Sequence, residues 1–349
     1  MRRLTIADIA EAAGVSTGSV SYALNGKPGV APETRARILR IAGDLGWRPS
    51  AAARALTGGR SGAIGLVVDR PAHVLGIEPF FMQLVSGIQA ELGPRSRTSL
   101  LLQVIDDRRA ELDTYRDWWA ERRVDGVLLV DLRAGDPRVD LVADIGLPAV
   151  ALGPPAPGAG LPCVWSDDAA GVRAAVGHLA ALGHRRIARV AGPPALLHTR
   201  DRDTAFAEAA LDAGLDRPPV VHTDYTGEDG ARATRRLLTR PGRPTALVFD
   251  NDVMALAALG AAHELGIGVP DQLSVIAWDD SPLCGLARPA LTAVARDIPE
   301  HGRRAAASLL RLIAGEPAAH VPTPLPVLTR RASTAPPPPE PGGGEPGTG

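Results

Sequence analysis

The sequence predicts an N-terminal all-α helix-turn-helix head followed by a larger α/β body with parallel sheets. Three observations support this fold class. In the first fifty residues, helix start and stop signals recur at short intervals. From residue 61 onward, short apolar runs alternate with helical periodicity, which is typical of parallel strands covered by helices. The body spans about 270 residues, too many for one small sheet, and this length indicates two lobes.

The head is predicted to hold three helices. Thr5 precedes an apolar helical stripe that Gly14 ends, and Ser16 is placed to cap a second helix over about residues 17–25. Pro32 suits the first turn of a third helix, which is expected to run to about residue 46. A tight turn between two short helices is the unit that many DNA-binding proteins use.

The body is predicted as alternating strands and helices. The expected strands are 64–68, 99–105, 126–130, 149–152, 187–191, 246–249 and 273–277. The expected helices include 81–92, 110–122, 169–182, 203–213, 231–238 and 253–265. The Pro- and Gly-rich stretch 153–162 is the expected crossover between the lobes. Residues 332–349 are mostly Pro, Gly, Glu and Thr and are expected to be a disordered tail.

Charge is divided unequally along the chain. Residues 1–60 carry nine basic and four acidic side chains, a net charge of +5, while the other 29 basic and 35 acidic side chains give −6. The total of −1 therefore conceals a basic head on an acidic body. This split, rather than the total, is the pattern that the function has to explain.

Cysteine content and hydropathy limit the cellular context. The two cysteines, Cys163 and Cys284, form neither a disulfide framework nor a metal-binding cluster, so a reducing, cytoplasmic compartment is expected. The N-terminus has no apolar stretch of the kind a secretion signal needs. The longest uncharged run, 146–166, contains five prolines, so no membrane partner is expected. Neither a metal nor a cofactor is expected.

One motif suggests a hydrolase. The run from Gly14 to Gly18 fits the pattern G-x-S-x-G, the nucleophile elbow of esterases. That chemistry needs a strand before the serine, whereas here a helix is predicted before it. A turn between two helices is therefore the favoured interpretation.

Acidic pairs follow several of the predicted strands. The carboxylates near Asp168, Asp252 and Asp279 lie where open parallel sheets bind ligands, and they suggest metal ligands or glycosidase carboxylates. The alternative is helix capping, which is favoured for Asp168 and Asp252. For Asp279, contact with a ligand is favoured, because Ser281 and Pro282 follow it rather than a clear helix.

The ordered set of short motifs resembles the lactose-repressor (LacI/GalR) family of transcription factors over about residues 3–334. In the head and the segment after it, the matching runs are Thr5–Ala10, Gly14–Ser16, Val20–Ser21, Leu24–Gly26, Leu45–Pro49 and Ala53–Leu56. In the body, they are Gly183–Ile187, Asn251–Ala255, Val269–Asp271, Trp278–Asp280 and Pro289–Thr292. The resemblance implies a periplasmic-binding-protein-like body, homodimers and allosteric repression of transcription at double-stranded operator DNA.

The resemblance also implies roles for individual residues of the second helix. Thr17, Gly18 and Tyr22 are expected to read base edges in the major groove. The expected contacts to DNA phosphates are Ser16, Ser19, Ser21 and Asn25. Many relatives carry arginine where this chain has Tyr22, which puts the operator sequence of a relative in doubt here. The alternative for Tyr22 is packing beside the small core.

Residues 48–56 resemble the hinge of the family. Ser50 replaces the more usual asparagine at the cap of this short helix. So short a helix is expected to order only on DNA, with Ala53 and Leu56 at the minor groove and Leu56 as the wedge. The alternative is a plain flexible linker.

The family resemblance places an effector between the two lobes. Phe80, Arg202, Asn251 and Asp279 match ligand positions, although Ala205 stands where glycine is usual. Such planar polar groups suit the hydroxyls of a sugar. The apolar face of its ring needs an aromatic surface, for which the candidates are Trp165 and Trp278, each with a structural role as the alternative.

The expected organisation joins these predictions. It consists of a DNA-binding domain at 1–46, a hinge and linker at 47–60, a body at 61–331 and the tail. Lobe 1 is expected at about 61–160 plus 293–322, and lobe 2 at about 161–292 plus 323–331. The predicted function is repression of transcription under the control of a small molecule, and a sugar is the expected effector. The alternatives are a sugar-binding protein of a transporter and a carbohydrate-active enzyme.

Overall fold

The computed structural model describes residues 4–47, 60–70, 75–93, 98–105, 107–155, 160–216 and 218–339. The chain forms two compact units, Met1–Ser61 and Gly62–Gly349. Ala53, Leu56 and the rest of the predicted hinge at 48–59 lie outside the described residues.

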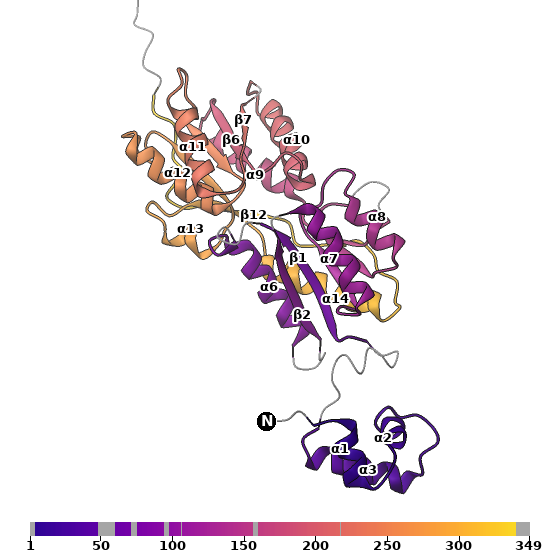
Figure 1. Ribbon diagram of the computed structural model, residues 1–349. Helices are drawn as coiled ribbons and strands as arrows, with labels where there is room; N and C mark the ends of the chain where they lie inside the picture. Colours follow the sequence, from indigo (N-terminus) through magenta and orange to yellow (C-terminus); the bar gives the residue numbers. More distant parts are fainter. Residues whose placement is uncertain are drawn as a thin grey trace, which may run out of the picture. The chain divides into compact units, whose positions relative to one another are not determined.

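The head contains the three predicted helices, α1 (Ile6–Ala13), α2 (Thr17–Leu24) and α3 (Pro32–Asp44) (Figure 1). Gly14 ends α1 in the left-handed conformation, with φ of 62°, which glycine adopts without strain. Ser16 caps α2 by accepting a hydrogen bond from the Ser19 backbone N–H at 3.1 Å. The shared core consists of Ile9, Ala10, Ala13, Val20, Ala23, Ile38 and Ala42.

The first lobe of the body is a six-stranded parallel sheet with helices on both faces. Its strand order is β11-β5-β4-β3-β1-β2. The strands are β1 (Ala63–Asp69), β2 (Ser99–Ile105), β3 (Gly126–Leu129), β4 (Ala149–Leu152), β5 (Cys163–Trp165) and β11 (Val321–Pro322). The helices are α6 (Pro79–Leu92), α7 (Arg108–Ala120), α8 (Pro137–Asp144) and α14 (Ile298–Ile313). Two apolar clusters, one on each face of the sheet, form the core.

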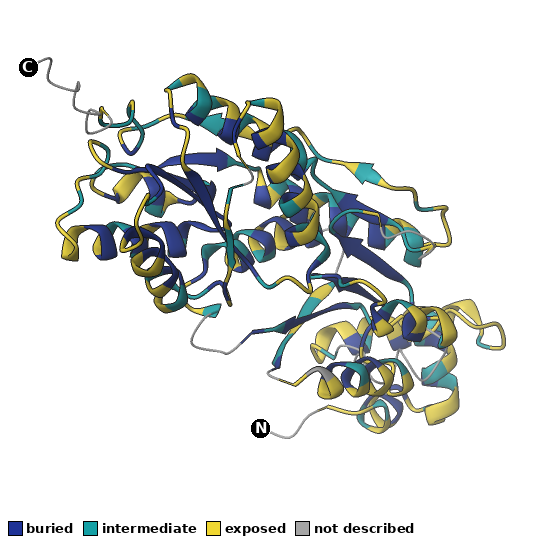
Figure 2. Cartoon of the chain, turned by 90° about the horizontal axis from the view of Figure 1, so that it is seen from above, coloured by how far each residue is buried: buried dark blue, intermediate teal, exposed yellow. Residues whose placement is uncertain are grey.

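The second lobe repeats this design with the order β12-β10-β9-β8-β6-β7. Its strands are β6 (Ile187–Ala191), β7 (Val220–His222), β8 (Ala246–Phe249), β9 (Ser274–Asp279), β10 (Thr292–Ala295) and β12 (Val327–Thr329). Only β12 among these described strands runs antiparallel to its neighbour. The helices are α9 (Asp168–Ala181), α10 (Leu197–Asp212), α11 (Gly227–Leu238), α12 (Asp252–Glu264) and α13 (Pro282–Leu286). Figure 2 shows the buried strands between more exposed helices.

The lobe boundaries differ from the prediction. The stretch 153–162 is not the crossover, because β4 and β5 on either side of it pair in the same sheet. The chain first crosses after Trp165, at the start of α9, and returns after β10, because residues 292–295 pair with β9 of the second lobe. A third crossing joins β11 to β12. Short apolar runs show that strands exist but not which sheet each one joins.

Helix α14 reaches the first lobe from far along the chain. It lies beside α6, as the orange-yellow and indigo ribbons in Figure 1 show. Gly87 and Gly302 let the two backbones approach, since a Cβ at Gly302 would lie 2.3 Å from the Leu84 carbonyl oxygen. Among the described residues, no helix has the length and apolar character needed to cross a bilayer.

The start of the predicted disordered tail is ordered. Ser333 is fully buried, and its hydroxyl donates to the Val275 carbonyl oxygen at 2.6 Å and accepts from the Thr292 N–H at 2.8 Å. His184 is hydrogen-bonded to the Ala335 carbonyl oxygen at 2.9 Å. The prediction was therefore wrong for residues 332–335, because composition does not reveal backbone groups that pair with the second lobe. Residues 340–349 lie outside the described part.

Candidate functional site

The head presents one polar surface along α2. Ser16, Thr17 and Gly18 are exposed at its N-terminus, and Ser19 and Ser21 are half-buried. Asn25, at the other end, is exposed and donates to the Ser21 carbonyl oxygen at 2.9 Å. Of the nine residues expected to contact DNA, the seven that belong to the head thus lie on one short helix and at its two caps.

Tyr22 lies on this surface rather than in the core. Its side chain is 48% exposed, and its ring lies against Gly29. The exposed part of the ring is accessible for the predicted base contact, and packing of the rest beside the small core stays the alternative. Arg35 of α3 braces the C-terminal end of α2 by donating to the carbonyl oxygens of Ala23, at 3.2 Å, and Lys27. This brace fixes the orientation of α2 within the head.

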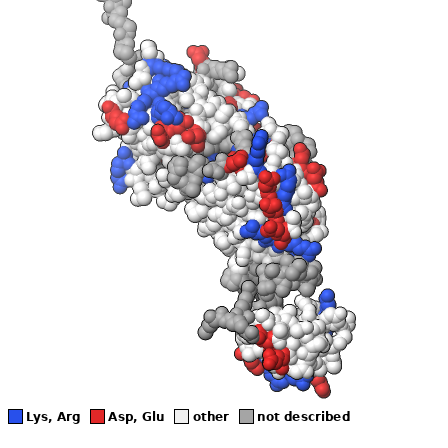
Figure 3. Space-filling model, viewed as in Figure 1, with Lys and Arg blue, Asp and Glu red and all other residues white. Residues whose placement is uncertain are grey.

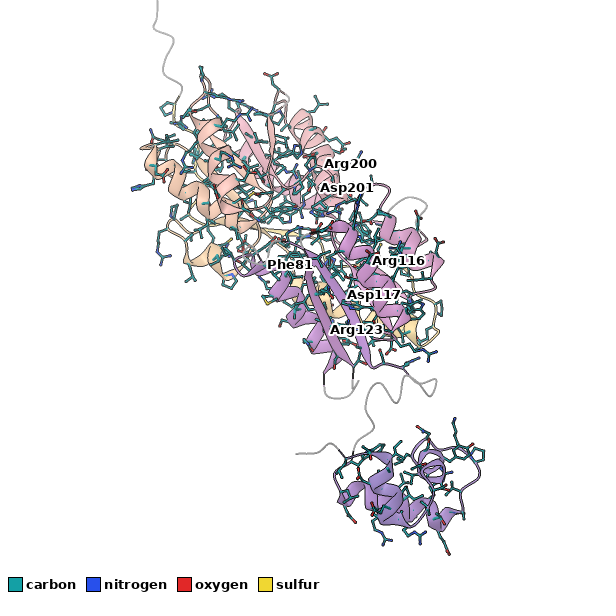
Figure 4. All side chains as sticks on the ribbon, in the orientation of Figure 1. Phe81, Arg116, Asp117, Arg123, Arg200 and Asp201 are labelled. Atoms are coloured by element: carbon teal, nitrogen blue, oxygen red, sulfur yellow. The ribbon has the colours of Figure 1, made fainter. Side chains whose placement is uncertain are left out.

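The body has a pocket between its two lobes, where strands of both sheets end. Phe80, Arg202, Asn251 and Asp279, the four residues expected to bind an effector, all line it. Phe80 lies in the first turn of α6, and the other three come from the second lobe. In Figure 4, Phe81 on α6 and Arg200 and Asp201 on α10 lie toward the boundary between the lobes.

Arg202 is held in place from two sides. Its Nη2 lies 2.6 Å from Oδ2 of Asp168, and its guanidinium lies 4.1 Å from the ring centroid of Trp278. Burial opposes the charge of Asp168, but Arg202 and Arg296 outweigh it and hold the pKa of this carboxyl well below its usual range. Trp278 is fully buried behind Arg202, and the side chains that line the pocket include neither it nor Trp165.

Arg296 connects two of the acidic side chains. Its Nε donates to Oδ1 of Asp279 at 2.8 Å, and its Nη1 lies 3.3 Å from Oδ1 of Asp168. The guanidinium also lies 5.8 Å from the ring centroid of Phe80 in the other lobe. Asp279 is therefore an ion-paired residue in the wall of the pocket, and Arg296 is the residue that orients it.

The first lobe contributes a second arginine cluster. Arg70, at the end of β1, lies 2.7 Å from the Asp131 carboxylate and 3.8 Å from Glu78. The pKa of Glu78 is raised to about 8, mainly by burial, because Arg70 opposes the shift only in part and the nearby carboxylates Asp131 and Asp279 add to it. Glu78 is therefore largely protonated at neutral pH.

Tyr225 and His198 close the pocket on the side of the second lobe. The His198 ring stacks on Tyr225, and its Nε2 lies 2.7 Å from the Tyr225 hydroxyl. Burial, reinforced by Arg202, lowers the pKa of His198 to about 4, so the ring is neutral at pH 7. Arg70 of the first lobe lies 5.5 Å from the Tyr225 ring centroid, and this contact joins the two lobes across the pocket.

The predicted caps are displaced by one residue. Asp167, not Asp168, caps α9 by accepting from the Ala170 N–H at 2.9 Å. Asn251, not Asp252, caps α12 by accepting from the Met254 N–H at 2.8 Å. The amide of Asn251 also donates to the Tyr225 carbonyl oxygen at 2.9 Å, so this side chain holds two elements of the wall together. In addition, Ser281 caps the short helix α13, where no clear helix was expected.

Three wall residues have strained backbones. Asp131, Tyr225 and Asp279 have φ of 54°, 73° and 75°, in the left-handed region that side chains other than glycine rarely adopt. Strain of this kind concentrates at ligand sites, where the surrounding structure keeps it in place. Asp131 and Tyr225 lie in loops and Asp279 ends β9, and all three line one pocket.

Sequence reasoning missed several residues of the wall, namely Arg70, Glu78, Asp131, His198, Tyr225 and Arg296. Asp131 had a usable signal, because it follows an apolar strand in the same way as Asp279. Arg296 had none, because the strand before it was not predicted.

In Figure 3, acidic and basic side chains of the body lie close together on the viewed face, as the ion pairs require.

The side chains that line the pocket carry no excess of positive charge. The charged side chains are three arginines and, with Glu78 protonated, four carboxylates, which leave no excess of positive charge for a phosphate. The rings of Phe80 and Phe81 add an aromatic surface to these planar donors and acceptors. Among the described residues, no group of three His, Cys, Asp or Glu side chains is arranged to hold a metal ion.

A helix-turn-helix head joined to a two-lobed ligand-binding body defines the class of ligand-responsive DNA-binding regulators. The family model for bacterial regulatory proteins of the lacI family matches residues 5–50, and that for the periplasmic binding protein-like domain matches residues 176–334. The transcriptional regulator CelR of Thermobifida fusca is 34% identical over 319 residues, 90% of this chain and 93% of its own. The chain therefore belongs to the LacI family.

Solved structures agree with this assignment. A CelR–cellobiose complex aligns with a TM-score of 0.72 and 32% identity, over 95% of this chain and 100% of its own. The lac repressor dimer bound to operator and the anti-inducer ONPF aligns with a TM-score of 0.81 and 26% identity, over 96% of this chain and 100% of its own. The protein is accordingly a DNA-binding transcriptional regulator and not an enzyme, and the hydrolase interpretation of Gly14–Gly18 is set aside.

Proposed function

We propose that this protein is a homodimeric repressor whose affinity for its operator is controlled by a sugar bound between the two lobes. The observation that carries the proposal is the composition of the inter-lobe wall. Arginines paired with carboxylates converge there with aromatic side chains and with no excess of positive charge. The relative CelR was solved with cellobiose, which supports a saccharide as the effector.

The DNA side of the proposal rests on α2. Thr17, Gly18 and Tyr22 would read base edges in the major groove, and Ser16, Ser19, Ser21 and Asn25 would contact phosphates. The half-exposed ring of Tyr22 lacks the fork of an arginine, so the operator differs from that of relatives with arginine there. Two heads of a dimer would read a roughly palindromic site, and Ala53 and Leu56 of the hinge would enter the minor groove between them.

The test is a gel shift with DNA from upstream of the protein's own gene. We expect Tyr22→Ala and Leu56→Ala each to weaken binding, whereas Leu211→Ala, at an exposed position of the body, leaves it unchanged. Affinity is expected to fall steeply with salt, because phosphate contacts release counterions. Retention of full affinity by Leu56→Ala contradicts the hinge wedge.

The sugar is tested in the same assay. Addition of the effector is expected to change operator affinity in the native chain but not in Arg202→Ala, because this side chain is central to the wall. By linkage, operator DNA changes sugar affinity by the same factor. A response to sugar that survives in Arg202→Ala contradicts the assigned pocket.

A further inference from the structure

We propose that Arg189 is a positioning residue of the inter-lobe pocket. By occupying the carboxylate of Asp250, it keeps Arg202 paired with Asp168. This inference rests on the proposed function only for the role of Arg202 toward the effector. Arg189 is the single charged residue of the otherwise apolar strand β6, it is 1% exposed, and it is not among the residues that line the pocket. Charged side chains are rarely buried so completely unless they are paired.

The register of the second sheet brings Arg189 to Asp250. Arg189 in β6 lies opposite Val248 in β8, and Asp250 follows Val248 by two residues. Side chains two residues apart along a strand point to the same face of the sheet. The guanidinium of Arg189 holds both oxygens of Asp250, with Nε 2.9 Å from Oδ1 and Nη2 2.7 Å from Oδ2. A bidentate pair of this kind fixes the orientation of the carboxylate.

Asp250 is a buried anion in the wall of the pocket. Its side chain is fully buried, and its Oδ2 also accepts a hydrogen bond from the Gly192 N–H at 3.0 Å. Burial opposes the charge of Asp250, but Arg189 and Arg202 outweigh it and lower the pKa of this carboxyl. Loss of Arg189 therefore leaves a buried carboxylate that needs another cation.

Arg202 is that cation, because it lies between two carboxylates. Toward Asp168, its Nε and Nη2 lie 2.7 Å and 2.6 Å from Oδ2. Toward Asp250, its Nη1 lies 3.9 Å from Oδ2, too far for a hydrogen bond, and donates only to the backbone carbonyl oxygen at 3.4 Å. A rotation of the guanidinium would exchange one carboxylate for the other. Arg189 prevents this exchange by saturating Asp250.

A third contact ties Arg189 to the helix that carries Arg202. Nη1 of Arg189 pairs with Oδ1 of Asp203, the residue after Arg202 in α10. The other oxygen of Asp203 lies 2.9 Å from Nε2 of His222, at the end of β7. Arg189 thus joins a carboxylate on α10 to the one that follows β8, and this double grip sets the spacing between Arg202 and Asp250.

The consequence for the pocket follows from the position of Arg202. This side chain lines the pocket, and its guanidinium lies 4.1 Å from the ring centroid of Trp278. A turn toward Asp250 would move the guanidinium away from Asp168 and change where its donor groups lie relative to a ligand. Arg189 therefore controls the geometry of the effector site without contacting the effector.

The test is a double-mutant cycle on the full-length protein, measured by urea unfolding at pH 8, which favours ionised carboxylates. Among the described residues, Arg189 and Asp168 form no ion pair with each other. In the native protein, Asp168→Asn removes the partner of Arg202 and raises the equilibrium constant for unfolding. In Arg189→Met, Arg202 has already turned to Asp250. The same substitution is therefore expected to raise this constant by a factor at least about tenfold smaller.

A third substitution shows whether the coupling passes through Asp250. In Arg189→Met/Asp250→Asn, no competing ionised carboxylate remains, so Arg202 stays on Asp168 and the full effect of Asp168→Asn is expected to return. If Arg189→Met does not fold, Arg189→Lys takes its place in the cycle. Its ammonium group keeps the charge but cannot grip both oxygens, so a smaller coupling of the same sign is expected.

Asp167→Asn is the matched control. Asp167 precedes Asp168, caps α9 and lies 3.6 Å from Arg173, so its substitution is expected to have the same effect in every background.

The outcomes separate this inference from the function beneath it. Equal effects of Asp168→Asn with and without the substitution of Arg189 overturn the positioning role, as does a reduced effect that persists after Asp250→Asn is added. The cycle contains neither effector nor operator. An additive result therefore leaves the sugar-responsive repressor standing, and a missing response to sugar leaves the measured coupling intact.

Discussion

At the scale of single residues, Arg202 supports both the ligand site and the stability of the second lobe. It is 2% exposed and pairs with Asp168, which is itself buried. Arg202→Ala leaves that carboxylate without its main partner, and loss of one member of a buried ion pair costs about 3–5 kcal/mol. We therefore expect a lower free energy of unfolding in urea. Arg200→Ala, at an exposed position on the same helix, is the control, and equal stability of the two variants contradicts this role.

Glu78 makes the free energy of unfolding of the protein depend on pH. Its pKa in the folded protein is about 8, above the value of 4.5 expected when it is unfolded, mainly because of burial. The folded state therefore binds more protons than the unfolded state between these values, and stability is lost as the pH rises from about 5 to about 8. Glu78→Gln removes this contribution to the pH dependence of stability, because glutamine does not titrate. The variant is expected to gain stability relative to the native protein by up to about 1 kcal/mol per pH unit.

The measurement is urea unfolding of both proteins at pH 5, 6.5 and 8. Glu208→Gln, which alters an exposed glutamate on α10, controls for general effects of removing a carboxylate. A stability difference between Glu78→Gln and the native protein that stays constant with pH contradicts the raised pKa of Glu78.

At the scale of elements, the crossing of α6 and α14 ties the end of the chain to the first lobe. A Cβ at Gly302 would lie 2.3 Å from the Leu84 carbonyl oxygen, so Gly302→Ala forces the two helices apart. Overpacking of this kind costs about 1–3 kcal/mol. In Gly177→Ala, on α9, the added Cβ meets no atom within 4 Å, so this variant is expected to gain about 0.5–1 kcal/mol from helix propensity. Thermal unfolding that lowers both melting temperatures equally contradicts this close packing.

Local signals in the sequence predicted most elements but not their partners. Strands 99–105, 149–152, 187–191 and 246–249 have the expected bounds, because each is an apolar run between turn residues. β10 has only four residues, and its place beside β9 depends on contacts that the local pattern does not contain. Helix α14 has recognisable start signals, with Asp297 as cap and Pro299 in the first turn, yet its packing on α6 is again a long-range property.

Only part of the site was predicted, because the residues that it brings together depend on long-range contacts that the local sequence does not show. Phe80, Arg202, Asn251 and Asp279 line the pocket, and they were found through the family resemblance. Arg70 and Arg296, which orient the acidic wall, follow strands whose register brings them to the pocket, and spacing alone does not show this. Asp168 was assigned to a cap, although its neighbour Asp167 has that role and leaves Asp168 free to pair with Arg202.

At the scale of the whole body, contacts made by the protein itself connect the two lobes. The Leu197 N–H of the second lobe donates to the Leu132 carbonyl oxygen of the first at 2.8 Å. Leu196 and Arg133 form an isolated bridge beside it, and the Leu197 side chain packs against the core of the first lobe. A ligand that alters the closure of the lobes has to compete with these contacts.

Leu197→Pro removes this inter-lobe hydrogen bond and keeps the helix. Leu197 is the first residue of α10, where proline is favourable, and Leu196 before it is already extended, with φ −81° and ψ 135°. Loss of one hydrogen bond worth about 1 kcal/mol shifts the equilibrium between closed and open lobes roughly fivefold toward the open form. Leu197→Ala keeps the N–H and so isolates the contribution of the side chain. We expect small-angle X-ray scattering to give a larger radius of gyration for Leu197→Pro than for Leu197→Ala, together with a changed operator affinity. If the two variants scatter identically and bind the operator alike, the hydrogen bond does not control closure.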